Sequence, residues 1–170
     1  MTVGTQTPRT PSESEPRPAA GEATMIEPVM PSDANVLGSA FGGRVMEWMD
    51  LAGSIAAQRH CRRPVVTASM DDLHFHAPIK IGHWAVLKSR VVAAFHTSME
   101  VGVTVHTEDP LTGDRRLCTS AFMTFVALDA HGSPVAVPPV SPESDDEKKL
   151  EREAHARRDE RLARKRALIR

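Results

Sequence analysis

The chain has 170 residues, of which 41% are hydrophobic and 25% charged, and its formal net charge is -1. This length favours a single domain with an ordinary core, and the near-neutral charge gives no indication of nucleic-acid or anionic-membrane binding. No apolar run approaches the roughly 18 residues that a membrane span needs. The two cysteines, Cys61 and Cys118, lack zinc-type spacing. We therefore expect a cytoplasmic protein with no signal peptide and no contact with membranes or nucleic acid.

The two ends of the sequence differ in composition from its middle. Residues 1–22 are rich in Pro, Ser, Thr and Glu, which is typical of a disordered tail. Residues 141–170 form a charged extension with acids early and bases late, as suits a helix dipole. We expect a solvated helix here, because its leucines are too sparse for a coiled coil. Alternatively, its basic side chains could reach a phosphate-bearing ligand or nucleic acid; they are Arg157, Arg158, Arg161, Arg164, Lys165 and Arg166.

The middle region, residues 23–140, is expected to form the folded domain. It begins with a short strand over 23–30, followed by a turn-rich loop. One strongly apolar helix then extends from Gly42 to about Arg59, and its apolar side chains cover more than one face, so other structure should wrap it. A lone carboxylate, Asp50, lies two turns inside this helix and requires an explanation.

The sequence after the helix is typical of antiparallel strands. Apolar and polar residues alternate with a period of two, most cleanly over residues 100–107. One buried helix followed by a meander of long strands predicts an α+β fold, in which the helix lies along the concave face of a curved sheet, the hotdog fold. The expected strands are 65–75, 83–95, 100–107 and 117–128.

Four segments, in order, resemble the hotdog acyl-CoA thioesterases of the bacterial short-chain and cytosolic brain-type acyl-CoA hydrolase family. They are PSDANVLGSAFGGRVMEWMDLAG, VTASMDDLHFHAPIKIGHW, HTSMEV and AFMTFVALDAHGSPVAVP, within about residues 24–140. The resemblance implies hydrolysis of fatty acyl-CoA to a free acid and CoA, with no cofactor beyond the CoA of the substrate. It implies a homodimer as the minimal unit, with a trimer of dimers as the expected assembly. It also implies that Asp50 carries the base.

The start of the helix and the loop before it offer groups for this chemistry. Backbone N–H groups at Gly42 and Gly43 can donate to an oxyanion, and the absence of a Cβ lets a substrate approach. Phe41 could pack on the acyl or pantetheine arm. Asn35 could donate to the carbonyl or position water. Alternatively, the glycines form a helix cap that needs permissive dihedral angles, and Asn35 forms an Asx turn.

Asp50 could act as a general base toward water or as a nucleophile. Alternatively, it is a structural carboxylate paired with Arg44 or Arg59, or with a partner across an interface. Asp50 lies eight residues beyond Gly42, which is about 12 Å along the axis at 1.5 Å per residue. Since one thioester cannot comfortably meet both, we expect a second subunit to supply the carboxylate across a two-fold interface.

Further residues are candidates for substrate binding. Thr97 and Ser98 join two strands and could hold the pantetheine or phosphates, or form a plain hairpin turn. Arg90 could face either phosphate or solvent. Met49, together with Val45 and Trp48, would form the floor of the acyl pocket, and its flexibility favours a tolerant pocket.

A metal site is the less favoured interpretation of the histidines. His74 and His76 point to the same face of one predicted strand, with His60 or His83 as a possible third ligand. No carboxylate or cysteine follows at a fixed spacing, so we expect no metal.

Three other functions remain as alternatives. A catalytically silent CoA-binding or oligomeric scaffold module would lack Asn35 or Asp50, yet both are present. A protein that binds nucleic acid or a partner through its tail would be more basic there. A hotdog CoA-ester dehydratase would pair a histidine with a carboxylate, and the loop and helix contain no histidine at the expected positions.

Overall fold

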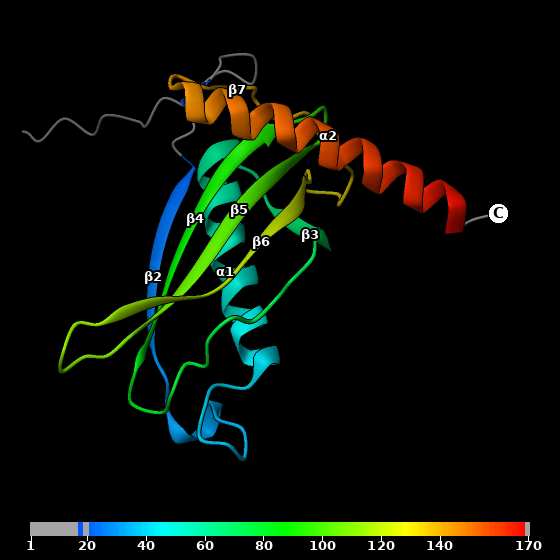
Figure 1. The fold of residues 1–170 in the computed structure, drawn as a ribbon. Coiled ribbons are helices and arrows are strands. Elements are labelled where there is room, and N and C mark those ends of the chain that lie inside the picture. Colours follow the sequence, from blue (N-terminus) through cyan, green and yellow to red (C-terminus); the bar gives the residue numbers. More distant parts are fainter. Residues whose placement is uncertain (1–16, 19–20, 169–170) are drawn as a thin grey trace, which may run out of the picture.

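A five-stranded antiparallel sheet forms the centre of the structure, a computed structural model that describes residues 17–18 and 21–168. The sheet order is β2-β4-β5-β6-β3 (Figure 1). One helix covers each face of this sheet, which is the predicted α+β hotdog arrangement with a charged C-terminal helix. The strands are β2 (Glu22–Pro28), β3 (Val65–Met70), β4 (Trp84–Ala94), β5 (Ser98–Glu108) and β6 (Arg115–Ala127).

Helix α1 (Gly42–Cys61) runs along the inner face of the sheet, as predicted, and ends two residues later than expected. It packs closely because of Gly53: a Cβ at this position would lie 2.9 Å from the ring of Phe125 on β6. The helix ends where Arg62 adopts the left-handed conformation, with a φ of 56°. Its buried side chains form a core with alternate residues of β5, namely Met99, Val101, Val103 and Val105.

Helix α2 (Asp145–Leu168) crosses the outer face of the sheet (Figure 1). It begins with a capping box, in which the Ser144 hydroxyl accepts the N–H of Glu147 at 3.2 Å and Glu147 accepts the N–H of Ser144 at 3.1 Å. Ala154 is fully buried and packs with Val92. The prediction of a solvated helix is therefore wrong for this face of α2.

Ion pairs also hold α2 on the sheet. Glu100 of β5 is fully buried, and its Oε1 accepts hydrogen bonds from Arg157 at 2.6 and 2.9 Å. Its Oε2 lies 2.8 Å from Nη1 of Arg161, which also bonds to Asp71. These ion pairs could not be predicted, because Glu100 occupies an outward-facing position in an alternating strand and such positions are normally exposed to solvent.

The segment 71–83 differs from the prediction, since β3 ends at Met70 and not at residue 75. A register shift between Thr67 and Ser69 interrupts the pairing of β3 with β6. The chain then follows an irregular path, held by bonds such as that from the N–H of His76 to the carbonyl of Cys118 at 2.7 Å. This path places His76 beside the start of α1.

Short elements complete the description: β1 (Arg17–Pro18), η1 (Pro31–Asp33) and β7 (Val140–Ser141), with β1 and β7 paired in parallel. The predicted disordered tail, 1–22, lies largely outside the described residues. None of the described helices is long and apolar enough to cross a membrane.

Candidate active site

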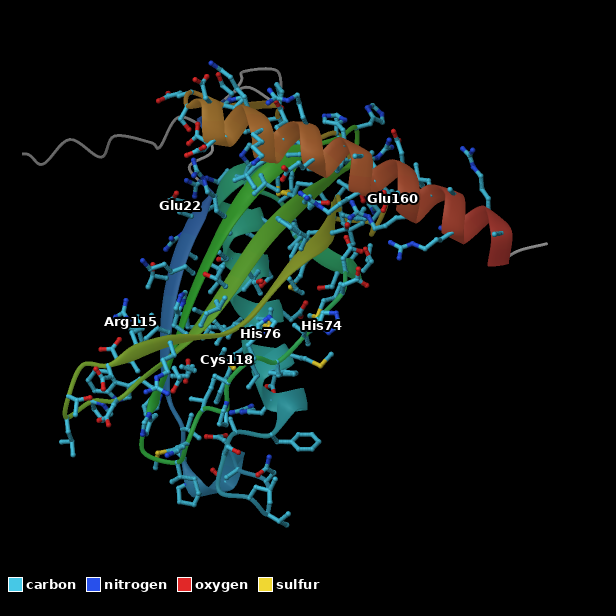
Figure 2. The ribbon with its side chains drawn as sticks, viewed as in Figure 1. Glu22, His74, His76, Arg115, Cys118 and Glu160 are labelled. Atoms are coloured by element: carbon cyan, nitrogen blue, oxygen red, sulfur yellow. The ribbon has the colours of Figure 1, made fainter. Side chains whose placement is uncertain are left out.

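A cavity of about 320 Å³ lies at the start of α1. The loop before the helix supplies Asn35, the helix supplies Gly42 and Val45, and the segment after β3 supplies Phe75 and His76. Cys118 of β6 closes one side. Figure 2 shows the labelled His76 and Cys118 near each other beside α1. The structure thus brings Asn35 and Gly42, two of the predicted site residues, to one cavity.

Asn35 forms the predicted Asx turn and still has donors to offer. Its Oδ1 accepts hydrogen bonds from the N–H groups of Leu37 at 2.9 Å and Ser39 at 3.4 Å. These two donors identify the oxygen of the amide, so the amide nitrogen of this cavity-lining residue remains available as a donor. The Asx turn and a role at the cavity are therefore compatible in one side chain.

The first turn of α1 provides backbone donors at the same cavity. The N–H groups of Arg44 and Val45 bond to the carbonyl of Phe41 at 2.9 and 3.1 Å, so those of Gly42 and Gly43 have no acceptor inside the helix. Neither glycine has a positive φ, so the permissive-dihedral explanation is wrong.

The two glycines differ in what surrounds them. A Cβ at Gly43 would lie 2.8 Å from the ring of Phe41, whereas one at Gly42 would make an ordinary 3.5 Å contact with Phe75. Gly43 therefore allows the ring of Phe41 to pack against the helix start. Phe41 itself is 61% exposed.

Asp50 does not line this cavity. It is half-buried, and the hydroxyl of Thr67 on β3 donates a hydrogen bond to its Oδ1. Among the described residues, Asp50 forms no ion pair with Arg44 or Arg59: Arg44 bonds to Asp33 and Glu47, and Arg59 donates to the carbonyl of Glu22. Thr67 was missed from the sequence, since only the fold places β3 beside this turn of α1.

The predicted substrate-binding residues are dispersed. Met49 is fully buried in the core, whereas Val45 lines the cavity. The carbonyl of Thr97 accepts the N–H of Ala127 at 3.0 Å, and Ser98 lines a second cavity under α2. Arg90 bonds to Glu147 and lies 3.4 Å from Glu22, so its charge helps to hold α2 and β2 together.

Two further groups at the first cavity were not predicted. His76 was considered only as a metal ligand, yet its side chain lines the cavity with Asn35. Burial raises the pKa of the Cys118 thiol to about 11, and the thiol donates to the carbonyl of Ala77 at 2.9 Å. A thiol with this pKa is protonated at neutral pH and is a poor nucleophile.

The histidines considered as metal ligands lie in different surroundings. In the described part of the chain, no group of three or more His, Cys, Asp or Glu side chains could hold a metal ion. His60 is buried, and its Nε2 lies 2.8 Å from the carbonyl of Pro138. His74 and His76, in contrast, are exposed, so His60 does not join them in one site.

The fold and the cavity define a hotdog protein with a cavity at the N-terminus of its central helix. Comparison with known proteins identifies its family. Residues 37–113 match the model of the thioesterase superfamily. The uncharacterized acyl-CoA thioester hydrolase YkhA of Bacillus subtilis is 46% identical over 81% of this chain and 80% of its own length. Mammalian relatives are longer, and this chain spans 24% to 36% of them.

Solved structures similar to this chain point to the same family. A hexameric acyl-CoA thioesterase has a TM-score of 0.84 and 38% identity, covering 94% of this chain and 100% of that one. An acyl-CoA hydrolase of Staphylococcus aureus in complex with butyryl-CoA, CoA and CoA disulfide has a TM-score of 0.81 and 35% identity, covering 89% and 92%. It has also been solved with an asparagine, an aspartate or a threonine replaced by alanine. The chain belongs to the hotdog acyl-CoA thioester hydrolase family.

Proposed function

We propose that this enzyme hydrolyses the thioester of fatty acyl-CoA at sites shared between two copies of the chain. One copy supplies Asn35 and the start of α1, and the other supplies Asp50 with Thr67. The observation that carries this proposal is that the cavity containing Asn35 and Gly42 lacks Asp50, which lies about 12 Å further along the helix. A single chain therefore holds two half-sites.

The mutated residues of the Staphylococcus aureus hydrolase support the choice of residues. Its asparagine and aspartate are fifteen positions apart, and its threonine follows seventeen positions later. Asn35, Asp50 and Thr67 are the same residue types at the same intervals. We therefore assign the three to one catalytic set.

The surface around Asp50 supports a shared site. Leu51 is 50% exposed and Met46 is 41% exposed on α1, and Val66 is 48% exposed on the neighbouring β3. In the described chain, β3 pairs with a strand on only one side. A second copy placed here would cover these apolar side chains and complete the carboxylate half-site. We propose a dimer as the minimal unit and a trimer of dimers as the assembly, in line with the hexameric relative.

The proposed mechanism uses water and protein groups, with CoA present only as part of the substrate. Thr67 donates to Oδ1 of Asp50 and fixes the carboxylate, which leaves Oδ2 to accept a proton from water as general base. The water attacks the carbonyl carbon. The N–H groups of Gly42 and Gly43, with the amide of Asn35, stabilise the oxyanion until the C–S bond breaks and the thiolate of CoA leaves.

Complementation between inactive subunits tests the shared site. We expect Asn35→Ala and Asp50→Ala to lose most butyryl-CoA hydrolysis separately. After the two variants are unfolded and refolded together in equal amounts, half of the dimers are mixed and each contains one intact site, so activity returns to about a quarter of the wild type. No recovery, with mixed dimers confirmed by mass spectrometry, would contradict the shared site.

A matched control uses two variants from the same half-site. Refolding Asp50→Ala together with Thr67→Ala restores nothing, because both residues come from one chain and every site retains one of the two lesions. Recovery in this pair as well would show that refolding itself, and not complementation, raises the activity.

A further inference from the structure

His76 lines the cavity that contains Asn35, and the hydrolysis described above assigns it no step. Its segment is held from two sides. The N–H of His76 donates to the carbonyl of Cys118 on β6 at 2.7 Å, and the carbonyl of Ile79 accepts the N–H of Ala40 at 2.8 Å. The segment is therefore tied both to the sheet and to the loop that carries Asn35.

The imidazole ring of His76 is exposed where it lines this cavity. Within the part of the chain that the structure describes, the ring has no hydrogen bond or ion pair to another side chain. It can therefore contact a bound substrate on one side and exchange protons with water on the other.

Hydrolysis of a thioester must deliver a proton to sulfur. In the proposed mechanism, the carboxylate of Asp50 takes a proton from water, and the C–S bond then breaks with its electron pair on sulfur. An alkyl thiol such as that of CoA has a pKa of about 8.5, like the side chain of cysteine, so at neutral pH the sulfur ends the reaction protonated. An acid placed beside the sulfur would accelerate this step.

Only His76 suits this role among the described residues that line the cavity. The hydroxyl of Ser39 and the amide of Asn35 keep their hydrogens at neutral pH. The thiol of Cys118 has a pKa raised to about 11 by burial and already donates to the carbonyl of Ala77, so it is too weak an acid to protonate a thiolate. Imidazole, in contrast, gains and loses a proton near neutral pH.

We propose that His76 is the general acid of the reaction. Its imidazolium N–H donates a proton to sulfur as the C–S bond breaks, so CoA leaves as a thiol and the acyl group leaves as an acid. The imidazole then regains a proton from solvent, and Asp50 loses to solvent the proton that it took from water, so no proton is consumed. The inference rests on the proposed function. It places the acid in the half-site of Asn35 and the base in the half-site of Asp50.

Two leaving groups of different basicity test this proposal. Butyryl-N-acetylcysteamine releases an alkyl thiol similar to that of CoA, whereas S-(p-nitrophenyl) thiobutyrate releases an aryl thiolate of lower pKa, which leaves more readily without a proton. For His76→Gln, we expect kcat/KM to fall about a hundredfold with the alkyl thioester and less than about threefold with the aryl thioester. Retained cleavage of the aryl thioester would also show that the variant is folded.

His74→Gln is the matched control, because His74 is exposed on the same segment and does not line the cavity. It should leave the cleavage of both thioesters unchanged. An equal fall with both thioesters in His76→Gln, or the same selective fall in His74→Gln, would overturn the proposal. Unchanged cleavage in His76→Gln would also overturn it and would mean that protonated Asp50 supplies the proton.

A binding measurement separates proton transfer from substrate binding. The butyl thioether of CoA has no carbonyl to hydrolyse and is titrated calorimetrically into the wild type and both variants. We expect Kd values within about twofold of each other, because a general acid acts on the transition state. Weaker binding in His76→Gln alone would show that His76 holds the substrate and would overturn the proposal.

The wild type distinguishes failure of this inference from failure of the proposed function. A wild type that cleaved neither thioester would overturn the proposed function and this inference with it. An active wild type with an equally active His76→Gln would overturn the inference alone.

Discussion

Helices α1 and α2 cover opposite faces of the same sheet, but they do so by different kinds of contact. The α1 face is an apolar core in which small residues set the distance, as Gly53 does against Phe125. The α2 face has a smaller apolar cluster around Ala154 and relies on the buried carboxylate of Glu100. We therefore expect a change of side-chain volume to destabilise the α1 face, and the loss of a charge to destabilise the α2 face. The proposed chemistry lies at the edge of the apolar face.

Removal of the buried carboxylate should have the largest effect on stability. Glu100→Ala leaves Arg157 and Arg161 without their shared partner, and breaking a buried pair in this way costs about 3–5 kcal/mol. Urea unfolding at one fixed protein concentration measures the loss. Glu160→Ala, at an exposed position of α2 (Figure 2), is the control and should change stability by less than about 0.5 kcal/mol. Equal effects would show that α2 is not held by Glu100.

A methyl group added at a glycine should show how tightly each face of the sheet is packed. Gly53→Ala places a methyl group 2.9 Å from Phe125 inside a packed core, and we expect a loss of about 1–3 kcal/mol in the free energy of unfolding. Gly102→Ala, on the outer face, meets Phe122 at 3.4 Å and Val92 at 3.5 Å and should be within about 0.5 kcal/mol of the wild type. A greater loss of stability for Gly102→Ala than for Gly53→Ala would show that the outer face, and not the α1 face, is the more tightly packed.

The smallest expected effect concerns the start of α2. Hydrogen bonds from the N–H groups of Ser144 and Glu143, and then from Arg90, lower the pKa of Glu147 from 4.5 to about 2. Because the folded pKa lies below the unfolded value, this stabilisation is complete above pH 4.5 and is lost as the pH falls toward 2. Glu147→Gln should therefore melt at a lower temperature than the wild type at pH 7, and the difference should shrink over that range. A constant difference would exclude ionisation as its cause.

Much of the fold could be predicted because its signals are local. The position of α1 follows from an apolar run that begins at a pair of glycines, and the alternation in 100–107 marks β5. Asn35 and Gly42 were predicted as one group because they are close in sequence as well as in space. The eight-residue spacing of Gly42 and Asp50 is the basis for the two half-sites, which remain a prediction.

The remaining features depend on contacts between distant segments. Thr67 is an ordinary strand residue until β3 lies beside Asp50, and Glu100 is an ordinary outward position until α2 crosses it. His76 reaches the cavity because the chain leaves the sheet after Met70, a departure that the strand-like composition of 65–75 concealed. No local sequence pattern predicts these contacts, because each of them depends on the order of all the strands in the sheet.

The unpaired edge of β3 also has a consequence for solubility. The strand β2 at the opposite edge contains Glu22, Glu27 and Pro28, residues that discourage further pairing. The sequence of β3, VVTASM, contains no charge and no proline. In an isolated subunit, the unpaired edge of β3 could pair with strands of other chains and start aggregation. The proposed dimer would cover this edge, so assembly would protect the protein from precipitation as well as complete the proposed active sites.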